Sequence, residues 1–321
     1  MRAPTGEQFV LTRPTATGGS STAIITEVAA GLRTFQIDGV DLTEPYAADR
    51  TPPSGNGIVL APWPNRVEDG IWLLDGKRQH LDITEPARHN AIHGLLRSTA
   101  YRVTDQSESS VTLAATVYPQ HGYPFMIDTT VTYELVEGGL TVTHGLRNAS
   151  AAKAPVAVGT HPFFRIGDVP VEELTLRLNA NTRFETDDRL IPIAENPVDG
   201  TKYDLREGQL VGDLWLDDAF GGVVPVDRLD DAFGGVVPVD GEAVHSLTAP
   251  DGRRVELWQD ESHPYVQVFT TRKFPKDGGL GLAVAIEPMT AAPNALNTGA
   301  GLKWLEPDEH WVVRWGIRYS A

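Results

Sequence analysis

Hydrophobic and polar residues alternate with a period of two along most of the chain. In residues 110–118, hydrophobic side chains occupy every second position, which is typical of a half-buried β-strand. Residues 129–136 and 140–146 alternate in the same way, and the turn formers Glu137-Gly138-Gly139 separate them. These two segments therefore predict a β-hairpin.

Many further short segments carry the same strand pattern. They are residues 22–28, 32–37, 57–61, 174–178, 254–258, 265–271, 282–286 and 311–319. No segment shows a long 3.6-residue period, and the 31 glycines and 23 prolines favour many chain reversals. The pattern predicts an all-β sandwich or barrel. Because no shift of composition marks a linker, we expect residues 1–321 to form one large domain.

One internal repeat interrupts this pattern. Residues 216–227 read LDDAFGGVVPVD, and residues 229–240 read the same twelve letters again. Two copies do not make a solenoid, so we interpret residues 216–240 as a 13-residue tandem duplication. A shift by an odd number of residues reverses the face of a strand, so one copy must leave the register of the other.

Composition and charge remove several classes of function. The net charge of −16 opposes binding to nucleic acid or to an anionic membrane surface, although it leaves room for a small anionic ligand. The absence of cysteine excludes thiol nucleophiles, disulfides, iron–sulfur clusters and cysteine-based zinc sites. There is no apolar run of 18 residues and no signal-peptide pattern after Arg2. We therefore expect a cytoplasmic protein without nucleic-acid or membrane partners.

Two polar segments in the first third of the chain are candidates for a site. The prolines and Trp around Arg66 (61–70, APWPNRVEDG) predict either a surface turn or a rigid loop that presents a guanidinium to a polar ligand. His89 and His93 have the four-residue spacing of metal ligands on a helix. Because Gly94 opposes a helix and no third ligand lies nearby, we expect no metal site. His93 is then a neutral donor or acceptor.

Two later segments carry groups suited to proton transfer. His161 lies in VGTHPFF (158–164), where Pro162 marks a strand end or an edge. Such a histidine is either a structural residue or an acid or base in a half-apolar pocket. Glu287 directly follows an apolar run, and a carboxylate at the end of a buried strand is costly unless it is paired or used. The chain has no phosphate-binding glycine loop and no GxSxG nucleophile elbow.

Taken in order, these segments resemble the aldose 1-epimerase (galactose mutarotase) family, over about residues 7–320. The resemblance rests on PWPNRVEDG, NAIHGLLR, GTHPFF and IEPMTAAPNALNTG, with GYPF and LWQDESHPYVQVFT in support. It implies a large antiparallel β-supersandwich of galactose-mutarotase type. Sugar-phosphate 1-epimerases have a similar HG-x-x-R segment, but PWPNR is closer to the free-sugar branch.

The resemblance also implies roles for particular residues. Glu287 would be the general base and His161 the general acid, while Arg66 and His93 would hold sugar hydroxyls or the ring oxygen. The substrate-binding aspartate of the family lies in a D-x-x-F context, which the duplication offers twice, at Asp217 and at Asp230. Either copy can supply it.

Mutarotation explains why such residues would suffice. The C1–O5 bond of the sugar breaks, C1–C2 rotates, and the ring closes on the other face. A base takes the O1 proton and an acid protonates O5, so no cofactor is required. We expect an ionised Glu287 and a protonated His161, facing each other across a pyranose-sized hollow on opposite sides of the anomeric carbon. A nearby Arg66 would favour the ionised carboxylate.

Three alternatives remain at this point. A glycoside hydrolase would pair Glu287 with Asp217 or Asp230 and leave His161 without a central role. A carbohydrate-binding module would bind a monosaccharide without accelerating anomer exchange. An epimerase of an anionic or phosphorylated sugar would use Arg66, Arg97 or Arg165. The sequence pattern does not specify the sugar or the oligomeric state.

Overall fold

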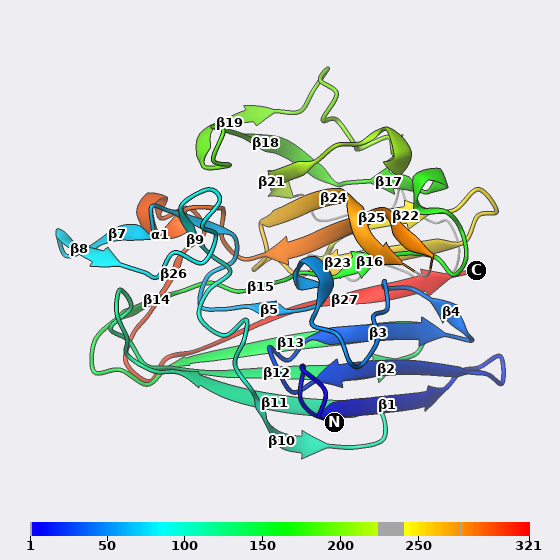
Figure 1. The fold of residues 1–321 in the computed structure, drawn as a ribbon, viewed down its shortest axis with the longest axis horizontal. Helices are drawn as coiled ribbons and strands as arrows, with labels where there is room; N and C mark the ends of the chain where they lie inside the picture. Colours follow the sequence, from blue (N-terminus) through cyan, green and yellow to red (C-terminus); the bar gives the residue numbers. More distant parts are fainter. Residues whose placement is uncertain (1, 224–240, 277) are drawn as a thin grey trace.

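Three antiparallel sheets make up most of the computed structural model, which describes residues 2–223, 241–276 and 278–321. A four-stranded sheet has the order β1-β2-β3-β4, and a nine-stranded sheet has the order β10-β11-β12-β13-β27-β23-β22-β17-β20. An eight-stranded sheet has the order β19-β18-β21-β24-β25-β15-β5, with β16 also paired to β25. Figure 1 shows these sheets with the hairpin β7–β8 and helix α1 at one end of the molecule.

The strands of the four-stranded sheet are β1 Gln8–Pro14, β2 Ser20–Thr26, β3 Leu32–Ile37 and β4 Val40–Asp41. Those of the nine-stranded sheet are β10 Arg102–Gln106, β11 Ser110–Val117, β12 Ile127–Val136, β13 Gly139–Asn148, β17 Thr175–Arg177, β20 Gln209–Leu210, β22 Ala243–Thr248, β23 Arg254–Gln259 and β27 His310–Ser320. Those of the eight-stranded sheet are β5 Val59–Leu60, β15 Gly159–Thr160, β16 Phe163–Phe164, β18 Ala180–Thr186, β19 Pro192–Pro197, β21 Asp217–Val223, β24 Tyr265–Lys276 and β25 Gly279–Met289.

Short elements connect and flank the sheets. The two-stranded pairs join β6 Arg66–Glu68 to β9 Asn90–Ile92, β7 Ile71–Leu74 to β8 Lys77–His80, and β14 Ala154–Val156 to β26 Lys303–Leu305. Three 3₁₀ turns, η1 Pro53–Gly55, η2 Val171–Glu173 and η3 Val211–Asp213, and the helix α1 Ala295–Thr298 complete the elements of the described residues. None of these helices is long and apolar enough to cross a membrane.

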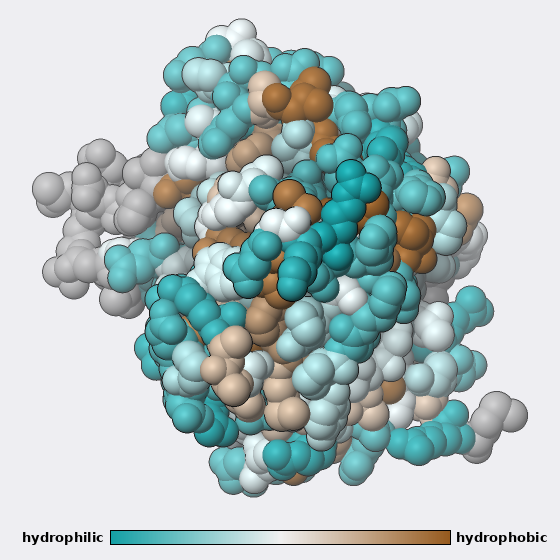
Figure 2. Space-filling view, turned by 90° about the vertical axis from the view of Figure 1, so that its left-hand side faces the viewer, coloured by the Kyte–Doolittle hydropathy of each residue, from teal (hydrophilic) through white to brown (hydrophobic). Residues whose placement is uncertain are grey.

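One large hydrophobic core holds the sheets together. Its buried side chains come from all three, for example Phe35 of β3, Tyr133 of β12 and Val268 of β24. Burial of so many apolar side chains is the dominant stabilising contribution to such a fold. On the face shown in Figure 2, hydrophilic residues surround small, separate hydrophobic patches.

The strand predictions agree with the structure wherever alternation was clear. β3 spans the predicted residues 32–37, and the hairpin predicted around Gly138 is β12–β13, paired from Ile127↔Asn148 to Val136↔Gly139. Strands such as β10, in which every residue is exposed, were not predicted because they carry no buried face to produce alternation. Within the first copy of the duplication (216–227), β21 spans Asp217–Val223, and residues 224–227 and the second copy lie outside the described residues.

Candidate active site

The register of the eight-stranded sheet brings the first pair of candidate residues together. Gly159 pairs with Met289 and Phe163 with Ala285, so the antiparallel count places position 161 opposite position 287. His161 occupies the short interruption between β15 and β16, and Glu287 lies inside β25. Side chains that are directly opposite on neighbouring strands share a face of the sheet and touch.

His161 and Glu287 are in direct contact. The His161 Nε2 atom lies 3.3 Å from Glu287 Oε1, and the two side chains are 6% and 2% exposed. The imidazole stacks on the Phe163 ring, with 5.3 Å between centroids, and meets the edge of Phe269. His161 Nδ1 and Glu287 Oε2 have no hydrogen-bond partner within the described part of the chain. Both atoms are buried, and unsatisfied buried polar atoms of this kind are uncommon outside functional sites.

Burial controls the ionisation of this pair. Loss of water raises the pKa of Glu287 well above its usual value, and the nearby Asp217 raises it further, whereas Arg66 opposes the change. Burial lowers the pKa of His161 to about 4. Both shifts oppose the charged form of the group concerned, and at Glu287 desolvation outweighs the Arg66 charge. The pairing of an ionised Glu287 with a protonated His161 stays a prediction.

A second group of polar side chains lines the opposite side of the hollow. Arg66 opens β6 and is 7% exposed, and its guanidinium donates to Glu85 through Nε at 2.9 Å and through Nη2 at 3.1 Å. The same Nη2 lies 3.3 Å from Asp217 Oδ2. Gln267 donates from Nε2 to Asp217 Oδ1 at 2.8 Å and accepts from Asn65 Nδ2 at 3.1 Å. This network fixes the directions of its donors and acceptors.

Backbone geometry places His93 beside this network. Asn65 and His93 have φ values of 56° and 64°, in the left-handed region that Asn and His tolerate better than most residues. The His93 amide donates to Asn65 O at 3.0 Å, and the Asn65 amide donates to His93 Nδ1 at 3.3 Å. Nδ1 is therefore an acceptor, which leaves the proton of the neutral ring on Nε2. Burial, followed by the positive fields of His161 and Arg66, lowers the pKa of His93 well below its usual value.

The glycine after His93 is required by a close approach of two chain segments. Gly94 has φ of 68°, and a Cβ atom there would lie 2.1 Å from the Ala61 carbonyl oxygen. That carbonyl accepts from the Leu95 amide at 2.8 Å. The HG pair thus holds the segment of His93 against the segment that carries Arg66.

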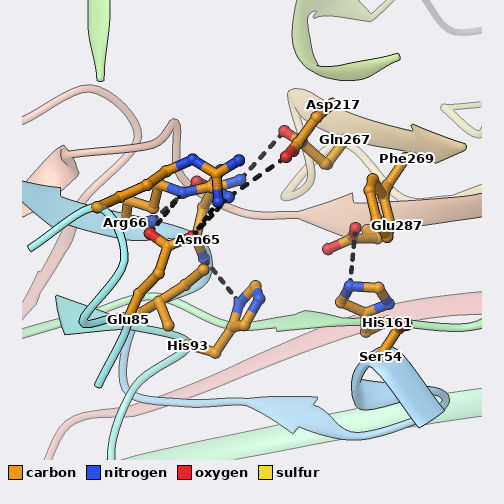
Figure 3. A pocket seen from close by; sticks show the side chains of 12 residues that line it. Ser54, Asn65, Arg66, Glu85, His93, His161, Asp217, Gln267, Phe269 and Glu287 are labelled. Carbon is orange, nitrogen blue, oxygen red and sulfur yellow. Dashed lines mark hydrogen bonds and ion pairs between the residues drawn. The ribbon is translucent and has the colours of Figure 1, made fainter. Parts of the chain in front are cut away.

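All of these side chains border one cavity of about 290 Å³, near the lower end of the size range of small-molecule sites. Figure 3 shows His161 and Glu287 on one side of it and Arg66, Glu85 and His93 on the other. The lining residues are Ser54, Asn65, Arg66, Glu85, Arg88, Ile92, His93, His161, Asp217, Gln267, Phe269 and Glu287. Within residues 2–223, 241–276 and 278–321, no cluster of three or more His, Asp or Glu side chains is arranged to hold a metal ion.

The structure brings together five of the six residues selected from the sequence: Arg66, His93, His161, Asp217 and Glu287 all line the cavity. Asp230, the sixth, lies outside the described residues. His89 does not join them, because its Nδ1 contacts Asp69 Oδ1 at 3.1 Å near the surface.

One geometric expectation is wrong. His161 and Glu287 do not face each other across the hollow but touch on one side of it. The physical reason is the register of the sheet, which places both side chains on one face of neighbouring chain segments.

Sequence reasoning did not select Asn65, Glu85 or Gln267 as site residues. Gln267 offered a signal, because it is a polar residue on a strand whose flanking Val266 and Val268 are fully buried. Its amide lies 3% exposed and opposite Glu287 in the register of β24 and β25. Glu85 could not have been selected in this way, since nothing in its local sequence indicates the ion pair with Arg66.

Comparisons with known proteins find several similar chains. The family model described as aldose 1-epimerase matches residues 15–318. The uncharacterized protein YihR of Escherichia coli (strain K12) is 30% identical over 290 residues, which cover 90% of this chain and 87% of YihR. Human galactose mutarotase is 30% identical over 158 residues, covering 47% of this chain and 45% of the human protein.

Solved structures share the fold. The GalM/aldose epimerase homologue from C. elegans superposes with a TM-score of 0.81 at 18% identity and covers 98% of this chain and 99% of its own. A galactose mutarotase-like protein from Clostridium acetobutylicum gives a TM-score of 0.78 at 18% identity, with the same coverage. The predicted all-β supersandwich of galactose-mutarotase type is confirmed.

Proposed function

Since the chain belongs to the aldose 1-epimerase family, we propose that it interconverts the α and β anomers of a free hexose by general acid–base catalysis without a cofactor. The observation that carries this proposal is the contact of His161 with Glu287 at 3.3 Å, inside a small cavity with a polar opposite side. A proton donor and a proton acceptor that touch each other can serve two oxygens on one carbon atom.

The reaction needs only the transfer of protons. In the ring-opening step, Glu287 takes the O1 proton as the C1–O1 double bond forms and the C1–O5 bond breaks. The released O5 takes a proton from His161. After rotation about C1–C2, the same steps run backwards on the other face of the carbonyl, and both residues regain their starting forms. Nothing is oxidised, and no group leaves.

His161 and Glu287 can share the same number of protons in two ways. A neutral imidazole beside a carboxylic acid holds as many protons as an imidazolium beside a carboxylate. The two forms differ by one transfer along the 3.3 Å contact. In our proposal the ion-pair form reacts, and ring opening converts it to the neutral form that burial favours. Part of the driving force for ring opening would therefore come from the neutralisation of a buried ion pair.

The opposite side of the cavity supports binding of an uncharged sugar. We propose that Arg66, His93 and Asp217 hold the ring hydroxyls. The Arg66 charge is already balanced by the carboxylates of Glu85 and Asp217, so it offers hydrogen bonds rather than a free positive charge. This balance favours a free hexose over a phosphorylated or otherwise anionic one.

The test is the rate of anomer exchange. Fresh α-glucose and α-galactose, together with a 6-phosphorylated hexose, are followed by polarimetry or by NMR, and the spontaneous rate is subtracted. We expect saturable acceleration with at least one free hexose and a lower kcat/KM with the phosphorylated sugar. Binding without acceleration would support a carbohydrate-binding module instead. Release of reducing ends from an aryl glycoside would support a hydrolase.

A further inference from the structure

A second, larger cavity lies outside the candidate active site. Its volume is about 840 Å³, and it is bordered by the last residues of β24, by the first residues of β25, by β3 and by the segment that follows β4. We propose that this cavity binds a small polyanion that carries phosphate or carboxylate groups. This inference goes beyond the proposed anomer exchange and does not depend on it.

The charge of the cavity is opposite to that of the chain. Its described lining contains the cations Arg33, Arg50, Arg165 and Lys276 and a single carboxylate, Glu44. The whole chain carries a net charge of −16. A concave cluster of four cations on an acidic protein concentrates positive potential where an anion would be held.

Only two of these four cations form an ion pair with the buried carboxylate of Glu44. Glu44 is 1% exposed and accepts from Lys276 Nζ at 2.6 Å, and Arg165 Nη1 lies 3.5 Å from its other oxygen. A buried carboxylate needs such partners, so Lys276 and Arg165 have a structural role. Arg33 and Arg50 have no carboxylate partner within the described residues, and the four cations of this lining exceed its one carboxylate by three charges.

The positions of these two arginines suit a bound anion. Arg33 is half-buried, and its guanidinium is held by hydrogen bonds from Nε to Tyr46 O at 2.9 Å and from Nη1 to Gln8 Oε1 at 2.9 Å. Arg50 is exposed and also lines the cavity. Guanidinium groups bind oxyanions by donating two parallel N–H hydrogen bonds. An apolar wall is supplied by Tyr46 and Leu280.

The cationic cavity and the candidate active site lie next to each other but are lined by different residues. Pro53 borders the cationic cavity and Ser54 borders the candidate active site, and the two cavities have no lining residue in common. Asn56 secures this segment, since its side chain donates to Glu44 O at 2.7 Å and accepts from the Phe163 amide at 3.2 Å. An anion in the second cavity therefore does not compete directly with a sugar for the same atoms.

The experiment is calorimetric titration of the full chain with citrate and with inorganic phosphate at fixed ionic strength, with sorbitol as an uncharged control. We expect saturable binding of at least one anion and none of sorbitol. The variant Arg50→Glu should weaken binding at least about tenfold. Arg102→Glu is the matched control, because Arg102 is exposed on β10 and the same net charge is lost outside this cavity.

Three outcomes would overturn the proposal. The first is the absence of saturable binding of either anion. The second is an equal loss of affinity in Arg50→Glu and Arg102→Glu, which would mean that only the overall charge matters. The third is binding that Arg66→Lys removes and Arg50→Glu leaves unchanged, which would place the anion in the candidate active site. Thermal unfolding of each variant shows whether the fold is retained.

Discussion

His161 and Glu287 lie opposite each other in the register of one antiparallel sheet, with 3.3 Å between Nε2 and Oε1. Backbone hydrogen bonds on both sides of the pair, at Gly159↔Met289 and Phe163↔Ala285, fix this separation. The distance is therefore a property of the sheet and does not depend on a mobile loop. Groups held in this way need little reorganisation before proton transfer.

The first prediction concerns the proton-transfer pair itself. Glu287→Gln keeps the shape of the side chain and removes the base, and His161→Asn removes the acid. Each should lower kcat for anomer exchange by at least about a hundredfold. Because the two residues act as a unit, the double variant should be little worse than either single variant. Polarimetry measures the rate of anomer exchange for each variant, and the midpoint of thermal unfolding shows whether the variant is folded. Full activity in Glu287→Gln would refute the assignment of the base.

The second prediction is the dependence of the rate on pH. Burial lowers the pKa of His161 to about 4 and raises the pKa of Glu287, so the pair holds one labile proton across the interval between the two values. As pH falls through about 4 the pair gains a second proton, and at high pH it loses its only one. We therefore expect the acid limb of kcat/KM to be centred near pH 4 and not near pH 6.5, the usual pKa of histidine. NMR of anomer exchange measures the profile, and an acid limb centred near pH 6.5 would contradict the burial of His161.

The third prediction uses the duplication as its own control. Asp217 lines the cavity and accepts hydrogen bonds from Arg66 and Gln267. Asp217→Asn should raise KM at least about tenfold, since hydrogen bonds to charged groups contribute about 1.5–3 kcal/mol. The same change in the second copy, Asp230→Asn, should leave KM within about twofold, because one aspartate suffices for this site. The reverse order of effects would assign the ligand to Asp230.

The fourth prediction concerns Arg189, which holds the segment of residues 84–93 from the far side of the cavity. Its guanidinium donates to four acceptors between 2.7 and 3.3 Å, namely Arg88 O, Asp69 Oδ1, His89 O and Asn90 Oδ1. Arg189→Ala should raise KM about three- to tenfold and change kcat by less than about threefold, because the reacting pair lies elsewhere. Arg189→Lys should restore part of the affinity. Arg102→Ala is the control for loss of an exposed arginine, and an unchanged KM in Arg189→Ala would exclude a positioning role.

The fold could be predicted from the sequence where one face of a strand is buried and the other face is exposed to solvent. This holds for β12 and β13, whose alternating burial is the physical origin of the alternating pattern. Strands such as β18 contain polar residues on both faces, and their pairing with β21 depends on partners more than 30 residues away. Local pattern cannot specify such pairing.

The candidate site could be predicted only in part for the same reason. His161 and Glu287 were selected individually, but their contact arises from a register between distant segments. Burial, which dominates the pKa changes of both residues, is a tertiary property that the local sequence does not show. Glu85 escaped notice since its role depends wholly on its position beside Arg66.

The division between sheet and connecting segments has an evolutionary consequence. The reacting pair is set by strand pairing, whereas Glu85, Arg88 and His93 come from the connections around β9. Under the proposed function, mutations in those connections can select a different stereochemistry of hydroxyl groups while the chemical step is preserved. A lineage built on this scaffold can then exchange one sugar for another without reinventing catalysis.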